Sequence, residues 1–236
     1  MIIKRILVLA NSIQRPPMRR VAGRELITEK TGQIRWGGWI RPVSNHDEGA
    51  LNVGEQRLPD AMDPEPLDVV QVPLSTPENN PLQPENWLMH MGQAWTKESY
   101  FDTQVLLTLI EEPDSLWLDP VQKNDWASAN VLPRLPNFQS LYLIRPEAFH
   151  FRIRPKVGQG SSERQVRGLF TYKGKPYDFA VADPLIGQKY FPDFPRTPEG
   201  DIQPGDCRRI LLCVSLTPPL RELPHRIIAT VLELPA

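Results

Sequence analysis

Short runs rich in β-branched and aromatic residues alternate with turn-forming residues along the chain, and they predict about ten strands. These runs cover residues 2–10, 21–28, 33–40, 67–74, 141–144, 149–154, 164–172, 177–182, 209–216 and 226–234. The 26 prolines cluster between the runs. Because proline interrupts helical hydrogen bonding, long helices are excluded over most of the chain.

Two segments have a helical character instead. Residues 96–110 lack proline and glycine, begin with the capping-type residue Thr96 and end before Pro113, which predicts a helix. A shorter helix is predicted over residues 185–190, where Asp183 and Pro184 are suitable cap and first-turn residues.

Each half of the chain therefore has about five strands and one helix, and the fold class is mainly β. We predict two tandem OB-like five-stranded barrels with one short helix each, because the OB fold is a five-stranded Greek-key barrel. SH3-like barrels and β-sandwiches can be built from the same pieces. The first domain is expected over residues 1–130, with an acidic insert that contains proline and tryptophan, and the second over residues 137–236.

Composition is ordinary for a globular protein, with 40% hydrophobic and 23% charged residues. No apolar run approaches the roughly 20 residues that a bilayer requires, and no export signal precedes the first strand. Cys207 and Cys213 are the only cysteines; on one extended strand they would lie too far apart for a disulfide. We expect free thiols, a cytoplasmic protein and no membrane partner.

Charges are segregated along the chain although the formal net charge is −1. Residues 4–41 hold nine basic and two acidic residues, a balance of +7, and residues 46–130 hold three basic and sixteen acidic ones, a balance of −13. Residues 131–236 return to +5, with fifteen basic and ten acidic residues. Folding can mix these charges on one surface or leave them as separate basic and acidic regions.

The clearest basic pattern lies in the second half, where His150, Arg152 and Arg154 alternate with apolar residues. Alternation places the basic side chains on one face of a strand. Residues 145–175 carry eight basic and two acidic residues, a balance of +6, with Arg167 and Lys173 among them. Such a stripe attracts a phosphate backbone, but an ordinary solvated strand face looks the same in sequence. The glycine-rich tip at residues 158–162 lacks the P-loop arrangement.

Other candidate contacts lie in the first half. Asn11 and Ser12 end the first strand, where they can close a turn or reach a ligand. Arg41 is two residues from Trp39 on a predicted strand face, so it can bind a base or phosphate, or pack over the ring. The tryptophans of the acidic middle are expected in the core rather than in base stacking: Trp87, Trp95, Trp117 and Trp126.

Catalytic patterns are missing from the sequence. The four histidines are scattered, and no HExxH, GxSxG, CxxC or Walker motif occurs. The sequence 46–48, His-Asp-Glu, is the one acid–base or metal candidate, but neighbouring strand residues point to opposite faces. We therefore expect no enzyme, no metal site and no cofactor.

Three stretches carry a family resemblance: residues 6–12 (ILVLANS), 20–25 (RVAGRE) and 38–44 (GWIRPVS). Together they resemble the dual OB-containing domain (DuOB) family, and residues 66–73, 140–145, 170–172 and 177–184 are similar to it as well. The resemblance implies two tandem OB barrels and a nucleic-acid-sensing role in prokaryotic conflict or antiviral systems. Residues 13–19 depart from the family with a double proline, which affects the contacts expected of that loop.

The leading hypothesis is a non-catalytic module that binds RNA or single-stranded DNA. Its expected contacts are Asn11, Ser12, Arg20, Arg24, Arg41, Arg152, Arg154, Arg167 and Lys173. The alternative is an adaptor whose acidic middle docks onto a partner effector enzyme, and an enzyme or a sensor of nucleotide-derived messengers comes third.

Overall fold

The computed structural model describes residues 1–46, 49–117, 126–127, 129, 132–156, 164–194, 196–219 and 223–235. The chain divides into two compact units, which we call the first and the second unit. The first unit contains residues 1–105 and 137–140, and the second contains residues 106–136 and 141–236. The first continuous stretch of the first unit thus ends at residue 105, and residues 106–130 of the acidic middle belong to the second unit.

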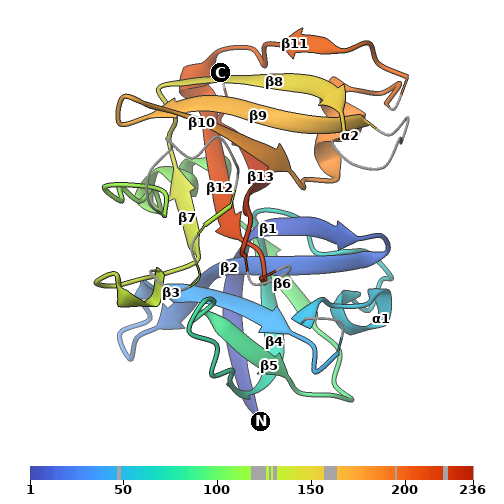
Figure 1. Cartoon of the computed structure of the whole chain (residues 1–236). Coiled ribbons are helices and arrows are strands. Elements are labelled where there is room, and N and C mark those ends of the chain that lie inside the picture. Colours follow the sequence, from blue (N-terminus) through green and yellow to red (C-terminus); the bar gives the residue numbers. More distant parts are fainter. Residues whose placement is uncertain are drawn as a thin grey trace. The chain divides into compact units, whose positions relative to one another are not determined.

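The first unit is a closed barrel of five strands with a sixth strand at its side (Figure 1). Its strands are β1 (Ile2–Arg15), β2 (Met18–Thr28), β3 (Ile34–Val43), β4 (Asp68–Pro77), β5 (Asn86–Met89) and β6 (Thr96–Tyr100). The order is β1-β2-β3-β5-β4, and β4 pairs back onto β1. Closure is possible because β1 is long: residues 2–7 pair with β4 and residues 6–15 with β2.

The interior of this barrel is filled by alternating apolar residues of several strands, as the sequence pattern predicts. Its core includes Ile6, Val8, Val21, Ile40 and Trp95. Gly23 lies opposite Val8 in the β1–β2 pair, and a Cβ atom at Gly23 would meet the Leu7 carbonyl oxygen at 2.1 Å. Only glycine permits so close an approach of two strands.

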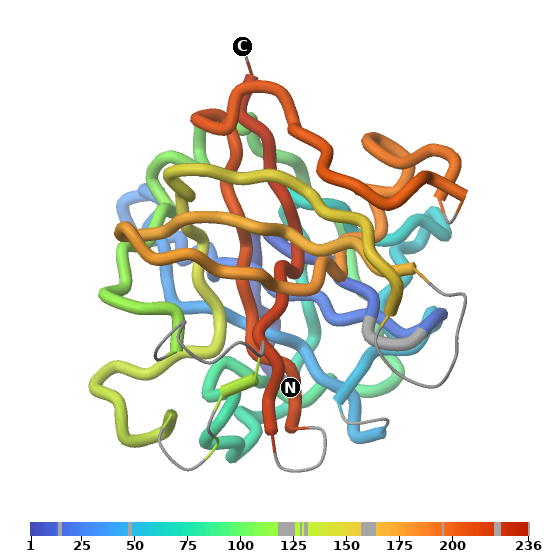
Figure 2. The backbone as a smooth tube through the Cα atoms, turned by 45° about the horizontal axis from the view of Figure 1, so that its top comes forward, coloured from blue at the N-terminus to red at the C-terminus, as the bar shows by residue number. Residues whose placement is uncertain are grey.

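The second unit repeats this order in a seven-stranded sheet, whose strands β8 to β10 run side by side (Figures 1 and 2). Its strands are β7 (Leu141–Ile144), β8 (Ala148–Pro155), β9 (Arg164–Tyr172), β10 (Lys175–Val181), β11 (Gly200–Ile202), β12 (Ile210–Leu216) and β13 (Arg226–Glu233).

β7 pairs with β12 and β8 pairs with β9, and three residues separate β7 from β8. β7 and β8 together therefore hold the place that the single long strand β1 holds in the first unit. The parallel β10–β13 pair matches the parallel β3–β5 pair. Both units thus have the OB strand order, and the predicted mainly β fold of two OB-like barrels is confirmed.

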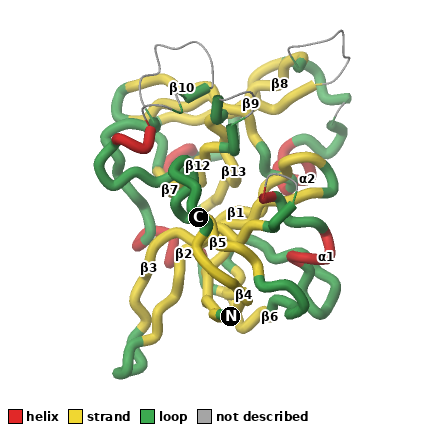
Figure 3. The backbone as a smooth tube through the Cα atoms, turned by 60° about the horizontal axis from the view of Figure 1, so that its bottom comes forward, coloured by secondary structure: helices red, strands yellow, loops and turns green. Residues whose placement is uncertain are grey.

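Helices are short, as Figure 3 shows. The predicted helix at 185–190 is confirmed as α2 (Leu185–Tyr190), and Asp183 Oδ1 accepts a hydrogen bond from the Leu185 backbone N–H at 2.9 Å. In the first unit the helix is α1 (Val53–Gln56), where Asn52 and Glu55 form a capping box. α1 lies between β3 and β4, and α2 lies between β10 and β12. In each unit these two strands hold the third and fourth places of the OB order.

The predicted helix over 96–110 is wrong. Residues 96–100 form β6, which pairs with β4, and a 3-10 helix follows at Thr103–Thr108. Pairing with the open edge of β4 prevailed over a weak helical propensity, because strand pairing depends on tertiary context.

All ten predicted strands are present, and β5, β6 and β11 were not predicted. Cys207 and Cys213 are free thiols, as predicted; Cys213 is buried and Cys207 is half-buried. No helix in the described part of the chain has the length and apolar character needed to cross a bilayer.

Barrel closure at Gly23 gives a stability prediction. Gly23→Ala should lower the free energy of unfolding by about 2–3 kcal/mol, because the added methyl group would overlap the Leu7 carbonyl. Gly38→Ala is the matched control, since a Cβ atom there has nothing within 4 Å. Urea unfolding of both variants measures the difference, and equal stabilities would contradict this packing.

Candidate functional site

Three of the contacts expected in the first unit lie together on β1 and β2: Asn11, Ser12 and Arg20. All three residues are buried, at 8%, 4% and 8% exposure. Asn11 Nδ2 donates to the Pro64 carbonyl at 2.8 Å, and Ser12 Oγ donates to the Arg20 carbonyl at 3.4 Å. These side chains hydrogen-bond to the backbone of their own barrel.

Arg24 and Arg41 also make contacts within the first unit. Arg24 donates twice to the Gly37 carbonyl, at 3.0 and 2.8 Å, and its guanidinium lies 5.8 Å from the centre of the Trp39 ring. The cation over Trp39 is therefore Arg24 rather than Arg41. Arg41 is 2% exposed and donates to Asn86 Oδ1 at 3.1 Å and to Ser140 Oγ at 3.0 Å.

Glu85 completes the surroundings of Arg41. Its carboxylate accepts hydrogen bonds from the backbone N–H and the hydroxyl of Ser140. A buried arginine requires such polar neighbours. Arg41 thus helps hold the returning segment 137–140 against β3 and β5.

The predicted basic face of β8 is present in the second unit. Phe149, Phe151 and Ile153 are buried at 2%, 0% and 1% exposure, while His150 and Arg152, like Arg154, are half-buried on the opposite side of the strand. The alternation predicted from the sequence is therefore confirmed. We call this side of the second sheet the outer face.

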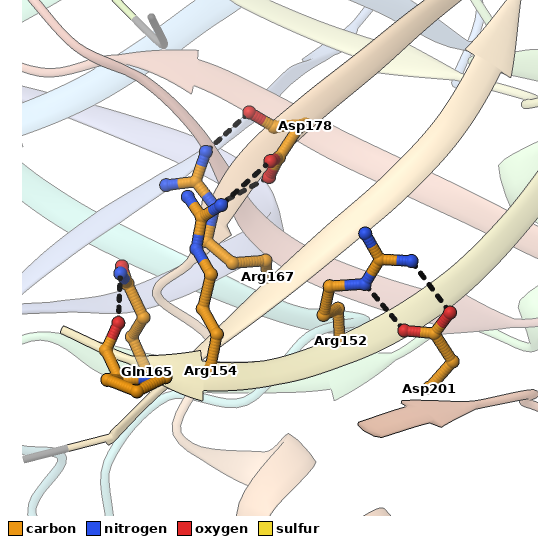
Figure 4. A network of polar contacts seen from close by, with 7 residues as sticks. Arg152, Arg154, Gln165, Arg167, Asp178 and Asp201 are labelled. Carbon is orange, nitrogen blue, oxygen red and sulfur yellow. Dashed lines mark hydrogen bonds and ion pairs between the residues drawn. The ribbon is translucent and has the colours of Figure 1, made fainter. Parts of the chain in front are cut away.

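Cross-strand pairing extends the outer face onto three neighbouring strands. Arg152 lies opposite Arg167 on β9, and Arg167 lies opposite Ala180 on β10. On the other side, Arg152 lies opposite Asp201 on β11. Three of the nominated arginines are thereby brought together, as Figure 4 shows for Arg152, Arg154 and Arg167.

Arg167 is the buried member of this group, with 5% of its side chain exposed. Its Nε donates to Asp178 Oδ1 at 2.6 Å, and its Nη2 donates to the Asp178 carbonyl at 2.5 Å. Arg154 Nη1 lies 3.4 Å from the second carboxylate oxygen, Asp178 Oδ2. One carboxylate therefore holds two arginines in place.

Arg152 is the more open arginine, with 43% of its side chain exposed. Its Nε and Nη2 donate to the two oxygens of Asp201 at 2.6 and 2.7 Å, a bidentate geometry. Hydrogen bonding to Arg152 lowers the pKa of Asp201, and the same contact raises the pKa of Arg152. His150 Nε2 lies 3.6 Å from Asp201 Oδ2.

Asp178 and Asp201 reduce the charge expected for this face. Sequence reasoning placed only the basic residues of β8 and β9 there. Asp178 alternates with buried Tyr177 and Phe179 along β10, so period-two patterning was a usable signal. Asp201 lies on β11, a three-residue strand that the sequence did not reveal.

Lys173 lies apart from the other nominated residues, at the turn between β9 and β10. Its Nζ donates to the Glu112 carbonyl at 3.0 Å and lies 3.4 Å from Asp114. Both partners belong to the acidic middle of the sequence, and the Asp114 carboxylate offsets part of the positive charge at this turn.

The tryptophans of the acidic middle are mainly core residues, as predicted. Trp95 and Trp117 are 0% and 2% exposed, and Trp87 packs partly buried against the barrel core. Trp126 is the exception at 42% exposure. The core prediction is therefore wrong for Trp126, because its segment pairs beside β13 rather than entering a core.

Among the residues that the structure describes, no group of three or more histidine, cysteine or acidic side chains is arranged to hold a metal ion. Two of the candidates from the sequence cannot be placed. Asp47 and Glu48 of the 46–48 cluster lie outside the described residues, and so does the glycine-rich tip at 158–162.

The closed barrel of the first unit, with its parallel β3–β5 pair, and the matching strand order of the second define a protein of the OB-fold class. The chain belongs to the dual OB-containing domain family (DuOB), whose model matches residues 4–231. Neither a search of curated proteins nor a search of solved structures found a match.

The Arg167–Asp178 pair gives a second stability prediction. Asp178→Asn should lower the free energy of unfolding by about 1–3 kcal/mol, because it leaves a buried guanidinium without its counter-charge. Asp206→Asn removes the same charge from the open Arg208 pair and should leave stability near wild type. Thermal unfolding compares them; equal melting temperatures would show that the Arg167 pairing contributes nothing.

Proposed function

We propose that the chain is a binding module for single-stranded nucleic acid and that the outer face of the second unit binds the phosphate backbone. OB folds bind oligonucleotides across the face formed by their second and third strands. In the second unit β7 and β8 together hold the first place, so the second and third strands of the OB order are β9 and β10. The outer face carries Arg167 on β9 and Arg152 and Arg154 on β8, the strand that pairs with β9. The position of this arginine group beside the binding face of the OB class is the observation that supports the proposal.

Ion pairing does not disqualify these arginines as phosphate ligands. A guanidinium has five N–H donors in a planar fork. Within the described part of the chain, Arg152 uses Nε and Nη2 on Asp201, which leaves Nη1 for an anion. The carboxylate also holds the guanidinium in one orientation, so less side-chain entropy is lost on binding. Arg154 and Arg167 share the single carboxylate of Asp178, so the two aspartates do not cancel the charge of all the arginines that they hold.

The nominated residues of the first unit have a smaller part in this proposal. Asn11, Ser12, Arg20 and Arg41 are buried, and burial limits their contact with a polymer. We assign them to holding the barrel together. A sensing role in prokaryotic defence, which the family resemblance implies, stays a prediction, and so does the cytoplasmic location.

The adaptor hypothesis ranks second. It relied on an acidic, tryptophan-containing middle, but Trp95 and Trp117 are buried, which leaves the half-buried Trp87 and the exposed Trp126 for docking. Binding rather than catalysis is the role that the OB class favours.

Charge reversal tests the proposal. The double variant Arg152→Glu, Arg154→Glu should weaken binding of a fluorescent oligodeoxythymidine at least tenfold in anisotropy titrations. It should also flatten the plot of log K against log salt by about 1.4, since each lost phosphate contact on a single strand contributes about 0.7. Arg35→Glu, Arg208→Glu is the charge-matched control, because both side chains are exposed, at 59% and 86%, and neither belongs to the arginine group.

Absence of measurable binding by the wild-type chain at 50 mM salt would remove the nucleic-acid proposal. Equal losses in the two double variants would mean that only net charge matters and would place the site elsewhere.

Asp201→Asn should have the opposite effect and raise the affinity for the same oligonucleotide severalfold. The substitution removes the carboxylate that competes with phosphate for Arg152. A gain of affinity cannot result from unfolding. Asp206→Asn removes a charge of similar exposure beside Arg208, 38% against 45% for Asp201, and serves as the control. An identical effect of both substitutions would argue against competition at Arg152.

A further inference from the structure

Trp126 is an exposed aromatic residue in a protein whose other described tryptophans are buried or half-buried. Its side chain is 42% exposed. Its ring packs edge-on against His225, with centroids 5.5 Å apart and an interplanar angle of 64°. The ring is therefore held in one place by its neighbour while part of its surface stays accessible to a ligand.

Backbone pairing holds Trp126 beside the start of β13. Trp126 and His225 form an antiparallel bridge, and the Ala127 N–H donates to the Pro224 carbonyl at 2.9 Å. Residues 217–225 connect β12 to β13, which hold the fourth and fifth places in the OB order. In OB folds the loop between these strands borders the oligonucleotide-binding face.

The direction of the neighbouring side chains shows on which side of the sheet His225 lies. The Arg226 guanidinium lies 5.6 Å from the centre of the buried Phe179 ring, on the inner side. A Cβ atom at inward-facing Gly168 would meet Ile228 Cδ1 at 2.3 Å. Side chains alternate along a strand, so His225 points to the outer face, and the Trp126 ring packed against it borders that face.

Cross-strand pairs connect this position to the arginines. Ile227 pairs with Ala180, Ala180 with Arg167, and Arg167 with Arg152. At about 4.8 Å per strand, the row from Ile227 to Arg152 spans roughly 14 Å, and His225 lies two residues, or about 7 Å, from Ile227 along the chain. One OB fold binds a segment of ~4–16 nucleotides. A single strand of that length can reach from the arginines to Trp126.

We propose that Trp126 is a base-stacking platform at the edge of the outer face. A nucleobase stacks on the indole while Arg152 and Arg154 of β8 bind the neighbouring phosphates, and the buried Arg167 stays paired with Asp178. This inference rests on the proposed nucleic-acid function and adds to it the class of ligand. Bases are open for stacking on a protein ring only in single strands, and stacking tolerates any base. The ligand is therefore a single strand bound with little sequence preference.

A comparison of normal and abasic oligonucleotides tests the platform. Trp126→Ala should weaken binding of a twelve-residue oligodeoxythymidine by about tenfold or more, and it should leave binding of an abasic strand of equal length unchanged. Trp126→Phe should recover much of the loss, because phenylalanine also offers an aromatic face. Tyr100→Ala is the control, since Tyr100 is an exposed aromatic residue of the first unit, at 77% exposure.

The outcomes separate the two proposals. If the wild-type chain binds both probes and Trp126→Ala weakens both equally or neither, the stacking platform is overturned while the nucleic-acid function stands. If the wild-type chain binds neither probe at 50 mM salt, both proposals are overturned.

A second measurement uses the unaltered protein, in case Trp126→Ala perturbs folding. Photo-crosslinking with an oligonucleotide that contains 5-iodouracil joins the base to a stacked aromatic ring, and mass spectrometry identifies the residue. We expect Trp126 to be the principal crosslinked residue. Crosslinking only to other residues would overturn the proposal.

Discussion

Arg167 is charged and almost completely buried, so it must have a counter-charge, and Asp178 provides it from the neighbouring strand. An unpaired guanidinium at this position would incur a large desolvation penalty. The pair joins β9 to β10 at 2.6 Å, and the second oxygen of Asp178 reaches Arg154. Because this ion pair is fixed by the strand register, the positions of Arg154 and Arg167 depend on it, while Asp201 holds Arg152 beside them.

The arginine pattern of β8 was predictable because it follows from local alternation. A strand with one face in the core must present every second residue to the other face, and residues 149–154 do so. The partners of these arginines were harder to predict. Asp201 is far from Arg152 in sequence and lies on β11, whose three residues give no periodic signal.

Barrel closure shows the same limit for the fold. Ten of the strands could be recognised from their composition, but the first barrel also requires β5, a four-residue strand among prolines. The segment 96–110 seemed helical because it lacks proline and glycine, yet residues 96–100 pair with β4. Pairing between distant segments decides such cases, and a single sequence does not display it.

Burial separates arginines that look alike in the sequence. Arg41 contacts Asn86 and Ser140, which are 45 and 99 residues away along the chain, whereas Arg152 remains open at 43% of its side chain. Both were nominated as ligand contacts. We assign nucleic-acid binding to the surface formed by Arg152, the neighbouring arginines Arg154 and Arg167, and the exposed ring of Trp126.

Mapping the bound surface by nuclear magnetic resonance tests this account most directly. An oligodeoxythymidine titrated into isotope-labelled protein at low salt should shift the arginine Nε–Hε signals of Arg152, Arg154 and Arg167 and the indole signal of Trp126. Backbone shifts should concentrate on β8, β9 and the start of β13. Shifts confined to the first unit, or no shifts at saturating oligonucleotide, would contradict the account.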